Sequence, residues 1–249
     1  MAKLENILGI QGTVGGITIY KLNGQWVARA AGGGFTREAI KRKESMELVR
    51  RQNEEFGLAS TANRLFRHAL RGLTGGTKIP QFHSRLQAEM QRLKEFHLQV
   101  PYGQRDAFMG MMTPSGLKAL QAYAYTPEAP WNKIMPYALA PLSAAPEVAL
   151  QLKAKKPKAP LVGATHLWAR MVVVEFRAEH RTIVPWYSEA VELSLEALPS
   201  SVSLVAPAPL GAEGPRPVFV GMRYGHQEGD KIMYSKDPKG FSMVCAGEV

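Results

Sequence analysis

The N-terminal part of the chain alternates apolar and polar residues in a way that is typical of a β-hairpin. Residues 17–22 form a β-branched and aromatic run, the dipeptide Asn23-Gly24 follows, and residues 25–29 return with the same alternation. Asn-Gly is the strongest two-residue signal for a type I′ turn, because both positions tolerate positive φ. Such a turn predicts the cross-strand pairs Leu22–Gln25, Tyr20–Val27 and Thr18–Arg29.

One face of this hairpin is apolar enough to need a partner, since it carries Ile17, Ile19, Trp26 and Ala28. Two strands alone are marginally stable in water, so the hairpin must dock on this chain or on another one. Glycines at 15–16 and 32–34 predict flexible joints on either side. We therefore expect the hairpin to be an arm that can reach beyond its own domain.

Residues 45–70 and 80–97 have apolar positions at three- and four-residue steps, the spacing of amphipathic helices. We expect the two helices to pack as an antiparallel helical hairpin. A third, shorter helix is predicted after Thr113, with Pro114 at its first position. The positions expected to face inward are Leu48, Gln52, Phe56, Ala59, Ala62, Phe66 and Leu70 in the first helix, and Phe82, Leu86, Met90, Leu93 and Phe96 in the second.

The pattern changes again in the last third of the chain. Residues 126–160 are rich in Pro and Ala and contain one candidate strand at 147–153. From Leu161 onwards, strand-length apolar runs are separated by Gly and Pro turns, as in an antiparallel sandwich or barrel. The sequence predicts an α+β protein: a hairpin arm (1–34), a basic helical region (35–125), a Pro/Ala-rich connector (126–160) and an immunoglobulin-like antiparallel β-sandwich (161–249).

Charge is distributed unevenly along the 249 residues. The net charge is +10, and residues 1–160 hold 23 Lys and Arg against 11 Asp and Glu, whereas residues 161–249 hold 8 against 10. The basic part predicts an acidic partner, either nucleic acid or an acidic surface of another copy. A solvated basic face that aids solubility is the alternative.

The predicted helices carry the arginines that would contact nucleic acid. Arg64, Arg67 and Arg71 recur at helical spacing and form one stripe, but no aromatic residue is interleaved with them as a stacking platform. No base-reading motif is recognisable, so any binding would be non-specific. The candidate nucleic-acid contacts are Arg50, Arg51, Arg64, Arg67, Arg71, Arg85 and Arg92.

Catalytic, cofactor and metal motifs are absent from the sequence. The six histidines are scattered, and none stands at metal-ligand spacing with another ligand. The glycines match neither a dinucleotide fingerprint nor a phosphate loop. The single cysteine, Cys245, lies in a predicted strand without a nucleophile signature, and it excludes an intrachain disulfide. We therefore expect a protein that is not an enzyme, with no cofactor, no metal and no small-molecule substrate.

The N-terminus lacks the apolar run of a signal peptide, and no apolar stretch is long enough to span a membrane. We therefore expect no membrane span. The expected location is the cytoplasm, or an assembled particle that is released without a signal peptide.

Three blocks of the sequence resemble an uncharacterised bacterial protein family. They are residues 12–21 with Asn23-Gly24 and Arg29, the segment 51–57 with the stretch that ends at Leu70, and residues 163–166, which open a strand. The chain differs from the family pattern around 37–45, where a proline-containing stretch is expected. The resemblance implies this order of elements and the absence of a signal peptide, and it assigns no function.

Two functions follow as hypotheses. The first is a structural protein that assembles into a ring, tube or filament, with the N-terminal hairpin adding strands to a neighbouring copy. The expected assembly interface comprises Ile17, Ile19, Tyr20, Trp26 and Val27. The second is a non-specific nucleic-acid-binding protein that uses the basic helices. Whether the hairpin packs within its own chain or on another copy is left open.

Overall fold

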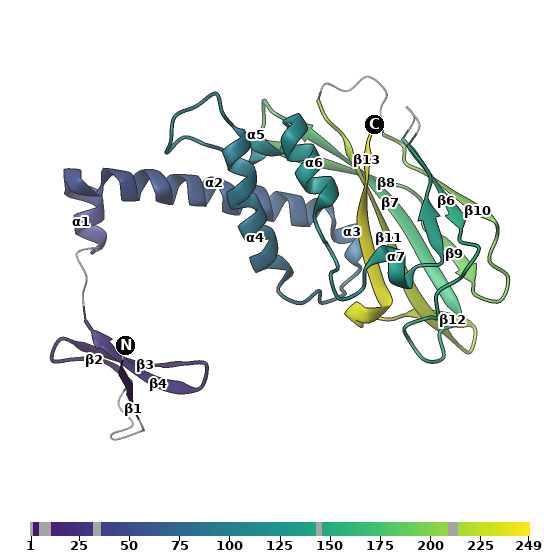
Figure 1. Cartoon of the computed structure of the whole chain (residues 1–249), viewed down its shortest axis with the longest axis horizontal. Coiled ribbons are helices and arrows are strands. Elements are labelled where there is room, and N and C mark those ends of the chain that lie inside the picture. Colours follow the sequence, from purple (N-terminus) through teal and green to yellow (C-terminus); the bar gives the residue numbers. More distant parts are fainter. Residues whose placement is uncertain (1, 5–10, 32–35, 143–145, 209–213) are drawn as a thin grey trace. The chain divides into compact units, whose positions relative to one another are not determined.

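The structure, a computed structural model, describes residues 2–4, 11–31, 36–142, 146–208 and 214–249 (Figure 1). It combines helices with antiparallel sheets, as the sequence predicts. The chain divides into two compact units, Met1–Glu54 and Glu55–Val249.

The N-terminal unit contains a four-stranded antiparallel sheet in the order β1-β4-β3-β2. Its strands are β1 (Ala2–Leu4), β2 (Gly12–Val14), β3 (Ile17–Leu22) and β4 (Gln25–Ala30). The unit also holds α1 (Arg37–Arg42), η1 (Glu44–Met46) and the first turns of α2 (Glu47–Ala69).

The predicted hairpin is confirmed by β3 and β4. Leu22 lies opposite Gln25 and Tyr20 opposite Val27, the pairs that a two-residue turn requires. Asn23 and Gly24 have φ values of 50° and 81°. Both residues therefore occupy the left-handed region that a type I′ turn needs.

Gly15 and Gly16 form a turn rather than the flexible joint that the sequence predicts. They connect β2 to β3 and both have positive φ, at 56° and 79°. The hairpin is therefore the centre of a larger sheet and not an isolated pair of strands. The second predicted joint, at 32–34, lies outside the described residues.

The second unit begins with a layer of helices. After α2 come α3 (Arg71–Thr74), α4 (Phe82–Leu93), η2 (Lys94–Phe96), α5 (Ala107–Met111), α6 (Pro114–Ala122) and α7 (Trp131–Ile134). Hydrogen bonds link Asn63 to His83 and Ser60 to Gln87, so α2 and α4 run antiparallel as predicted. Thr113 caps α6 by accepting a hydrogen bond from the Gly116 amide at 3.0 Å, with Pro114 at the first helical position.

The inward face of α2 is predicted correctly in its second half but not in its first. Ala59, Ala62 and Phe66 are buried, whereas Phe56 is 54% exposed and Leu48 is also exposed. Glu55 is buried in place of Phe56. The reason lies far along the chain, in the groups that bind the Glu55 carboxylate.

Two antiparallel sheets follow the helices. The larger, six-stranded sheet has the order β12-β11-β7-β8, with β13 paired to β11 and β9 paired to β7. Its strands are β7 (His166–Arg177), β8 (Thr182–Tyr187), β9 (Val191–Ser194), β11 (Pro217–Glu228), β12 (Lys231–Tyr234) and β13 (Phe241–Glu248), with η3 (Pro238–Gly240) before the last. The smaller sheet has the order β10-β6-β5, from β5 (Tyr137–Leu139), β6 (Glu147–Leu152) and β10 (Ser201–Val205).

The six-stranded sheet lies between the helices and the three-stranded sheet (Figure 1). Val172 and Phe219 pack in one core cluster with the helices, whereas Met171 and Val220 pack in a second cluster with β6 and β10. A sheet that is covered on both faces needs apolar residues at successive positions, which explains the unbroken run at 171–174. The C-terminal strands form a half-barrel, and the predicted immunoglobulin-like arrangement is not confirmed.

The end of the predicted connector, at residue 160, does not separate two packed parts. Helices of the 35–125 region share a core cluster with β7 and β11, and the division between compact units falls inside α2. Residues 126–160 are not simply a connector either, because Tyr137, Val148 and Leu150 are fully buried in the second cluster. The change in charge near residue 160 therefore does not mark a domain boundary, and β6 and β10, on either side of it, pair in one sheet.

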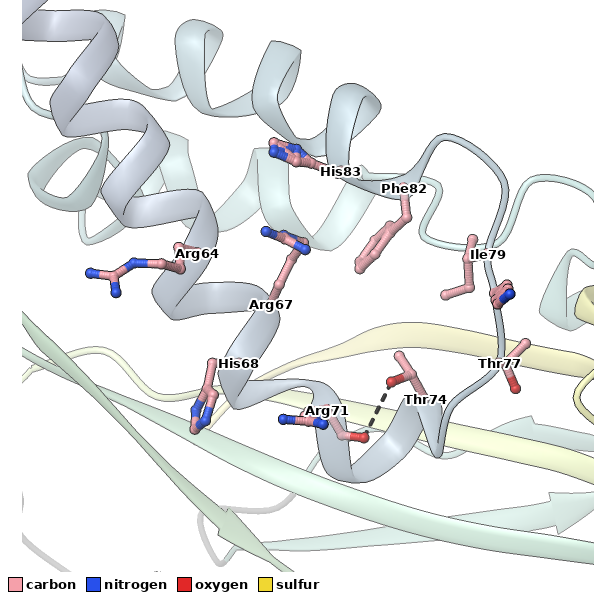
Figure 2. Close-up of a pocket in the computed structure, with 10 residues that line it drawn as sticks. Arg64, Arg67, His68, Arg71, Thr74, Thr77, Ile79, Phe82 and His83 are labelled. Atoms are coloured by element: carbon pink, nitrogen blue, oxygen red, sulfur yellow. Dashed lines mark hydrogen bonds between the residues drawn. The ribbon is translucent and has the colours of Figure 1, made fainter.

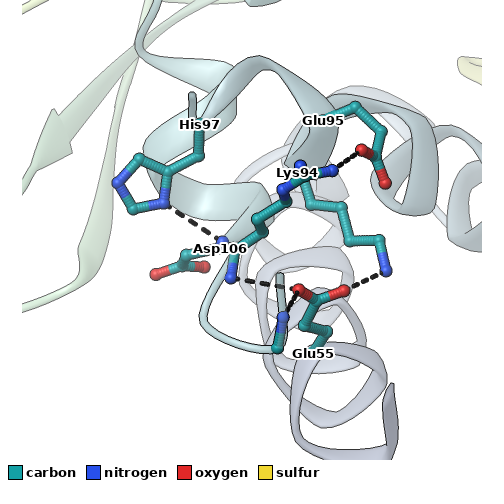
Figure 3. A network of polar contacts seen from close by, with 7 residues as sticks. Glu55, Lys94, Glu95, His97 and Asp106 are labelled. Atoms are coloured by element: carbon teal, nitrogen blue, oxygen red, sulfur yellow. Dashed lines mark hydrogen bonds and ion pairs between the residues drawn. The ribbon is translucent and has the colours of Figure 1, made fainter. Parts of the chain in front are cut away.

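A buried polar network explains the position of Glu55 (Figure 3). Its carboxylate accepts hydrogen bonds from Lys94 Nζ at 2.5 Å and from the backbone amides of Gly103 at 2.6 Å and Arg105 at 3.2 Å. Burial raises the pKa of the Glu55 carboxyl, but these hydrogen bonds together outweigh that effect and leave its pKa below the ordinary value of 4.5. The network joins α2 to the end of α4 and to the loop before α5.

The end of α2 is held on the six-stranded sheet by two side chains. The Tyr187 hydroxyl donates to the Ala69 carbonyl at 2.8 Å and accepts from the Gly72 amide at 3.1 Å. Buried Arg223 of β11 donates to the Leu73 carbonyl at 2.9 Å and also to the carbonyls of the next two residues. These carbonyls end α3, so the guanidinium supplies the donors that the helix end lacks.

No helix among the described residues is both long enough and apolar enough to cross a lipid bilayer.

The Glu55 network predicts an acid-dependent stability. Folding lowers the pKa of Glu55, so its ionised carboxylate contributes to the free energy of unfolding. This contribution is complete above pH 4.5 and is lost as the pH falls through the folded-state pKa. We expect Glu55→Gln to lower the free energy of unfolding by about 3 kcal/mol at neutral pH, since it leaves Lys94 without its buried partner. Urea denaturation at pH 7 and in acid should show that the difference in free energy of unfolding between wild type and variant is smaller in acid.

Glu95→Gln is the matched control, because its carboxylate pairs with Arg105 but is 47% exposed. An exposed pair contributes less than about 1 kcal/mol. Equal losses for the two variants at neutral pH would contradict the role assigned to Glu55.

Two glycines of the α2–α3 segment should respond in opposite ways to alanine. A Cβ at Gly72 would lie 2.4 Å from Tyr187 Cε1, whereas a Cβ at Gly57 meets no atom within 4 Å. We expect Gly72→Ala to destabilise the protein by about 1–3 kcal/mol through overpacking. Gly57→Ala should stabilise it by up to about 1 kcal/mol through helix propensity. Thermal unfolding of both variants tests these two predictions. An unchanged melting temperature for Gly72→Ala would show that Tyr187 does not fix the junction of α2 and α3.

Candidate anion-binding pocket

A pocket of about 570 Å³ lies where the end of α2, α3 and the start of α4 meet (Figure 2). It is confined to the second unit and to a short part of the chain. We call it the basic pocket, and its lining residues are Arg64, Arg67, His68, Arg71, Thr74, Thr77, Lys78, Ile79, Phe82 and His83.

Helix geometry places the cationic side of the basic pocket. Arg64 and Arg67 are three residues apart and lie on one face of α2, and Arg71, the first residue of α3, lines the same pocket. Arg64 and Arg71 are exposed, and Arg67 is half-buried. The residues of the opposite face pack in the helical core cluster, which leaves the arginines on the side of the pocket.

Arg67 is held in position by a buried amide. Its Nε donates to Asn63 Oδ1 at 3.0 Å, and the amide nitrogen of Asn63 donates in turn to Gln87 Oε1 at 2.8 Å and to the His83 carbonyl at 3.2 Å. This chain of hydrogen bonds joins α2 to α4 and leaves the terminal nitrogens of the Arg67 guanidinium for a ligand. A guanidinium that is oriented beforehand loses little freedom when it binds an anion.

Thr77 belongs to the wall of the pocket, but its hydroxyl does not open into it. The residue is 8% exposed, and its Oγ1 is buried and has no hydrogen-bond partner within the described part of the chain. A buried hydroxyl without a partner costs roughly 1–3 kcal/mol. The groups that a ligand can reach are therefore the cationic side chains of the lining.

The charge of the pocket is positive and is not balanced by its own lining. Arg64, Arg67, Arg71 and Lys78 carry permanent charges, and the lining includes no carboxylate. The chain has no Asp or Glu at all from residue 56 to residue 88. The start of α4 adds the partial positive charge of a helix N-terminus, and Gln81 gives it no side-chain cap. The basic pocket is therefore suited to an anion.

The structure separates the seven predicted nucleic-acid contacts into two groups. Arg64, Arg67 and Arg71 line the basic pocket together. The other four bind groups of their own chain instead. Arg50 and Arg85 donate to backbone carbonyls, those of Ile40 and Lys43 and those of Ala124 and Tyr125, respectively. Arg51 and Arg92 pair with the carboxylates of Glu47 and Glu89, respectively.

Sequence reasoning missed most of the pocket wall. It assigned Phe82 to the apolar stripe of its helix, and it did not select Thr77, Lys78 or His83. These residues face the arginine stripe only because α4 folds back along α2. One signal was available in the sequence, namely the long segment without any acidic residue.

The predicted assembly residues all lie in the N-terminal sheet, on both of its faces. Val27 is the only described side chain of this sheet that is buried, at 6% exposure. Ile19, Tyr20 and Trp26 are half-buried, and Ile17 is 48% exposed. Lys21 lies over the Trp26 ring, 5.2 Å from its centroid, so that ring is covered by a cation of its own sheet.

Cys245 is buried, and burial raises the pKa of its thiol to about 12. The thiol is therefore protonated at neutral pH and is a poor nucleophile. Within the described residues, no group of three or more His, Cys, Asp or Glu side chains is placed to hold a metal ion.

The resemblance to a bacterial family remains a prediction. No family model, curated protein or solved structure matches the chain.

Proposed function

We propose that this chain is a non-enzymatic nucleic-acid-binding protein that holds phosphate groups in the basic pocket. The observation that carries the proposal is a pocket lined by three arginines and a lysine, without a carboxylate, in which Asn63 holds the Arg67 guanidinium in position. Phosphate oxygens are matched by guanidinium groups and accept hydrogen bonds from hydroxyls.

A polymer suits the pocket better than a single small anion. Arg64 and Arg67 are about 4.5 Å apart along the axis of α2, and Arg71 lies beyond its end, at the start of α3. A DNA strand carries a phosphate about every 3.4 Å of helix axis, so this row of arginines can contact more than one phosphate. The net charge of +10 adds a general attraction to polyanions.

Self-assembly is a second proposed function, and a different observation favours it. The N-terminal sheet buries only one of its described side chains, while Val14, Ile17 and Leu22 stay exposed. A sheet without an apolar core of its own gains stability by docking on a partner. Its edge strands β1 and β2 can extend a sheet of a second copy, because strand addition uses main-chain hydrogen bonds.

The salt dependence of binding tests the first function. Binding of duplex DNA should weaken with salt, with a slope of about −0.9 in log K against log salt for each phosphate neutralised. We expect the combined change Arg64→Gln, Arg67→Gln and Arg71→Gln to reduce the magnitude of this slope by about 2–3. Fluorescence anisotropy across a salt series measures it.

The control for this experiment removes the same charge elsewhere, by Arg42→Gln, Arg51→Gln and Arg92→Gln. Each of these arginines pairs with a carboxylate of its own helix. If this control variant lost as much slope as the pocket variant, binding would follow net charge and not the basic pocket.

Particle mass tests the second function. We expect the wild-type chain to form particles well above its monomer mass of 27.4 kDa at low and at high salt, and Trp26→Ala to shift them toward the monomer. Leu48→Ala is the control, because Leu48 is exposed but lies outside the sheet. Light scattering that shows a wild-type monomer at both salt concentrations would refute assembly.

A further inference from the structure

The basic pocket has an apolar side as well as a cationic one. Phe82 and Ile79 line it together with the arginines, and Figure 2 shows the Phe82 ring directed from the start of α4 toward the space beside Arg67 and Thr74. Phe82 is half-buried, so part of its ring packs on the helical core and part remains accessible. A simple phosphate site would not need this apolar side.

We propose that the basic pocket takes one unpaired nucleotide of a single strand, with its base against Phe82 and its phosphate at Arg67 and Arg71. This inference rests on the proposed nucleic-acid binding and specifies the form of nucleic acid. An aromatic ring beside a cationic groove is the combination by which proteins bind single strands without reading sequence.

The size and shape of the pocket favour a single strand over a duplex. About 570 Å³ lies within the range of pockets that enclose small organic ligands. Bases in a duplex are stacked and paired, so they cannot enter a concave site, whereas an unpaired base can turn out and stack on a side chain. A duplex would reach only the exposed arginines at the rim.

The fixed groups of the pocket define where the phosphate lies. Arg67 is oriented by Asn63, and the Arg71 guanidinium belongs to the same lining. Arg223 binds the carbonyls of α3 and so holds the backbone between Arg71 and Thr77. The base side and the phosphate side are therefore both attached to rigid parts of the fold.

The test compares three fluorescent probes on the full-length protein: a short oligothymidylate, an abasic strand of the same length, and a duplex of the same length. Wild-type protein should bind the oligothymidylate about fivefold to 100-fold more tightly than the abasic strand, the range expected for stacking of one base. The duplex should bind more weakly than the oligothymidylate at the same salt concentration.

Two variants assign the preference to Phe82. Phe82→Leu keeps an apolar side chain on the core but removes the ring, so it should lose the preference for the base-bearing strand and leave binding of the abasic strand unchanged. Phe82→Tyr should retain the preference. Thermal unfolding reports whether each variant is folded, and the comparison of probes on wild-type protein needs no variant.

The outcomes separate this inference from the proposed function. Equal wild-type affinity for the oligothymidylate and the abasic strand would overturn the inference and leave phosphate binding intact, as would an unchanged preference in folded Phe82→Leu. Failure of all three probes to bind would overturn the proposed function itself.

Discussion

The attachment of the α2–α3 corner to the six-stranded sheet is the constraint on which the second unit depends. Arg223 is buried between the rings of Trp168 and Phe241 and binds the carbonyls that end α3. A guanidinium in such a place needs hydrogen-bond acceptors, because a buried charge without partners is costly. The carbonyls at the helix end accept from both terminal nitrogens, whereas Nε has no partner among the described residues. These bonds in turn fix the helix end. The six-stranded sheet therefore determines the position of the α2–α3 corner and of the basic pocket that this corner lines.

Local features of the fold were predictable from the sequence because neighbouring residues determine them. Asn23-Gly24 specifies its turn through backbone conformation, and the turn then sets the register of β3 and β4. The apolar run at 171–174 is also local, but that both of its faces are covered is known only from the structure. By contrast, the burial of Glu55 depends on amides at 103 and 105, about fifty residues away, and no helical periodicity contains that information.

The candidate site shows the same limit. The stripe of Arg64, Arg67 and Arg71 was visible, but its separation from Arg85 was not, because Arg85 binds carbonyls that only the fold brings near. The pair of Arg92 with Glu89 is local to one helix and follows from helical spacing. Phe82 looked like a core residue, and it does pack partly on the core. Its second role as a wall of the pocket follows from the position of α4 beside α2.

The bond between Arg223 and Leu73 joins residues 150 positions apart. The basic pocket is built from residues 64–83, yet the side chain that holds its backbone belongs to a strand near the C-terminus. During synthesis, the pocket residues leave the ribosome long before β11 exists. The segment that contains α3 therefore lacks its bond to Arg223 until most of the chain has been made. The pocket reaches its final geometry only when the last strands join the sheet.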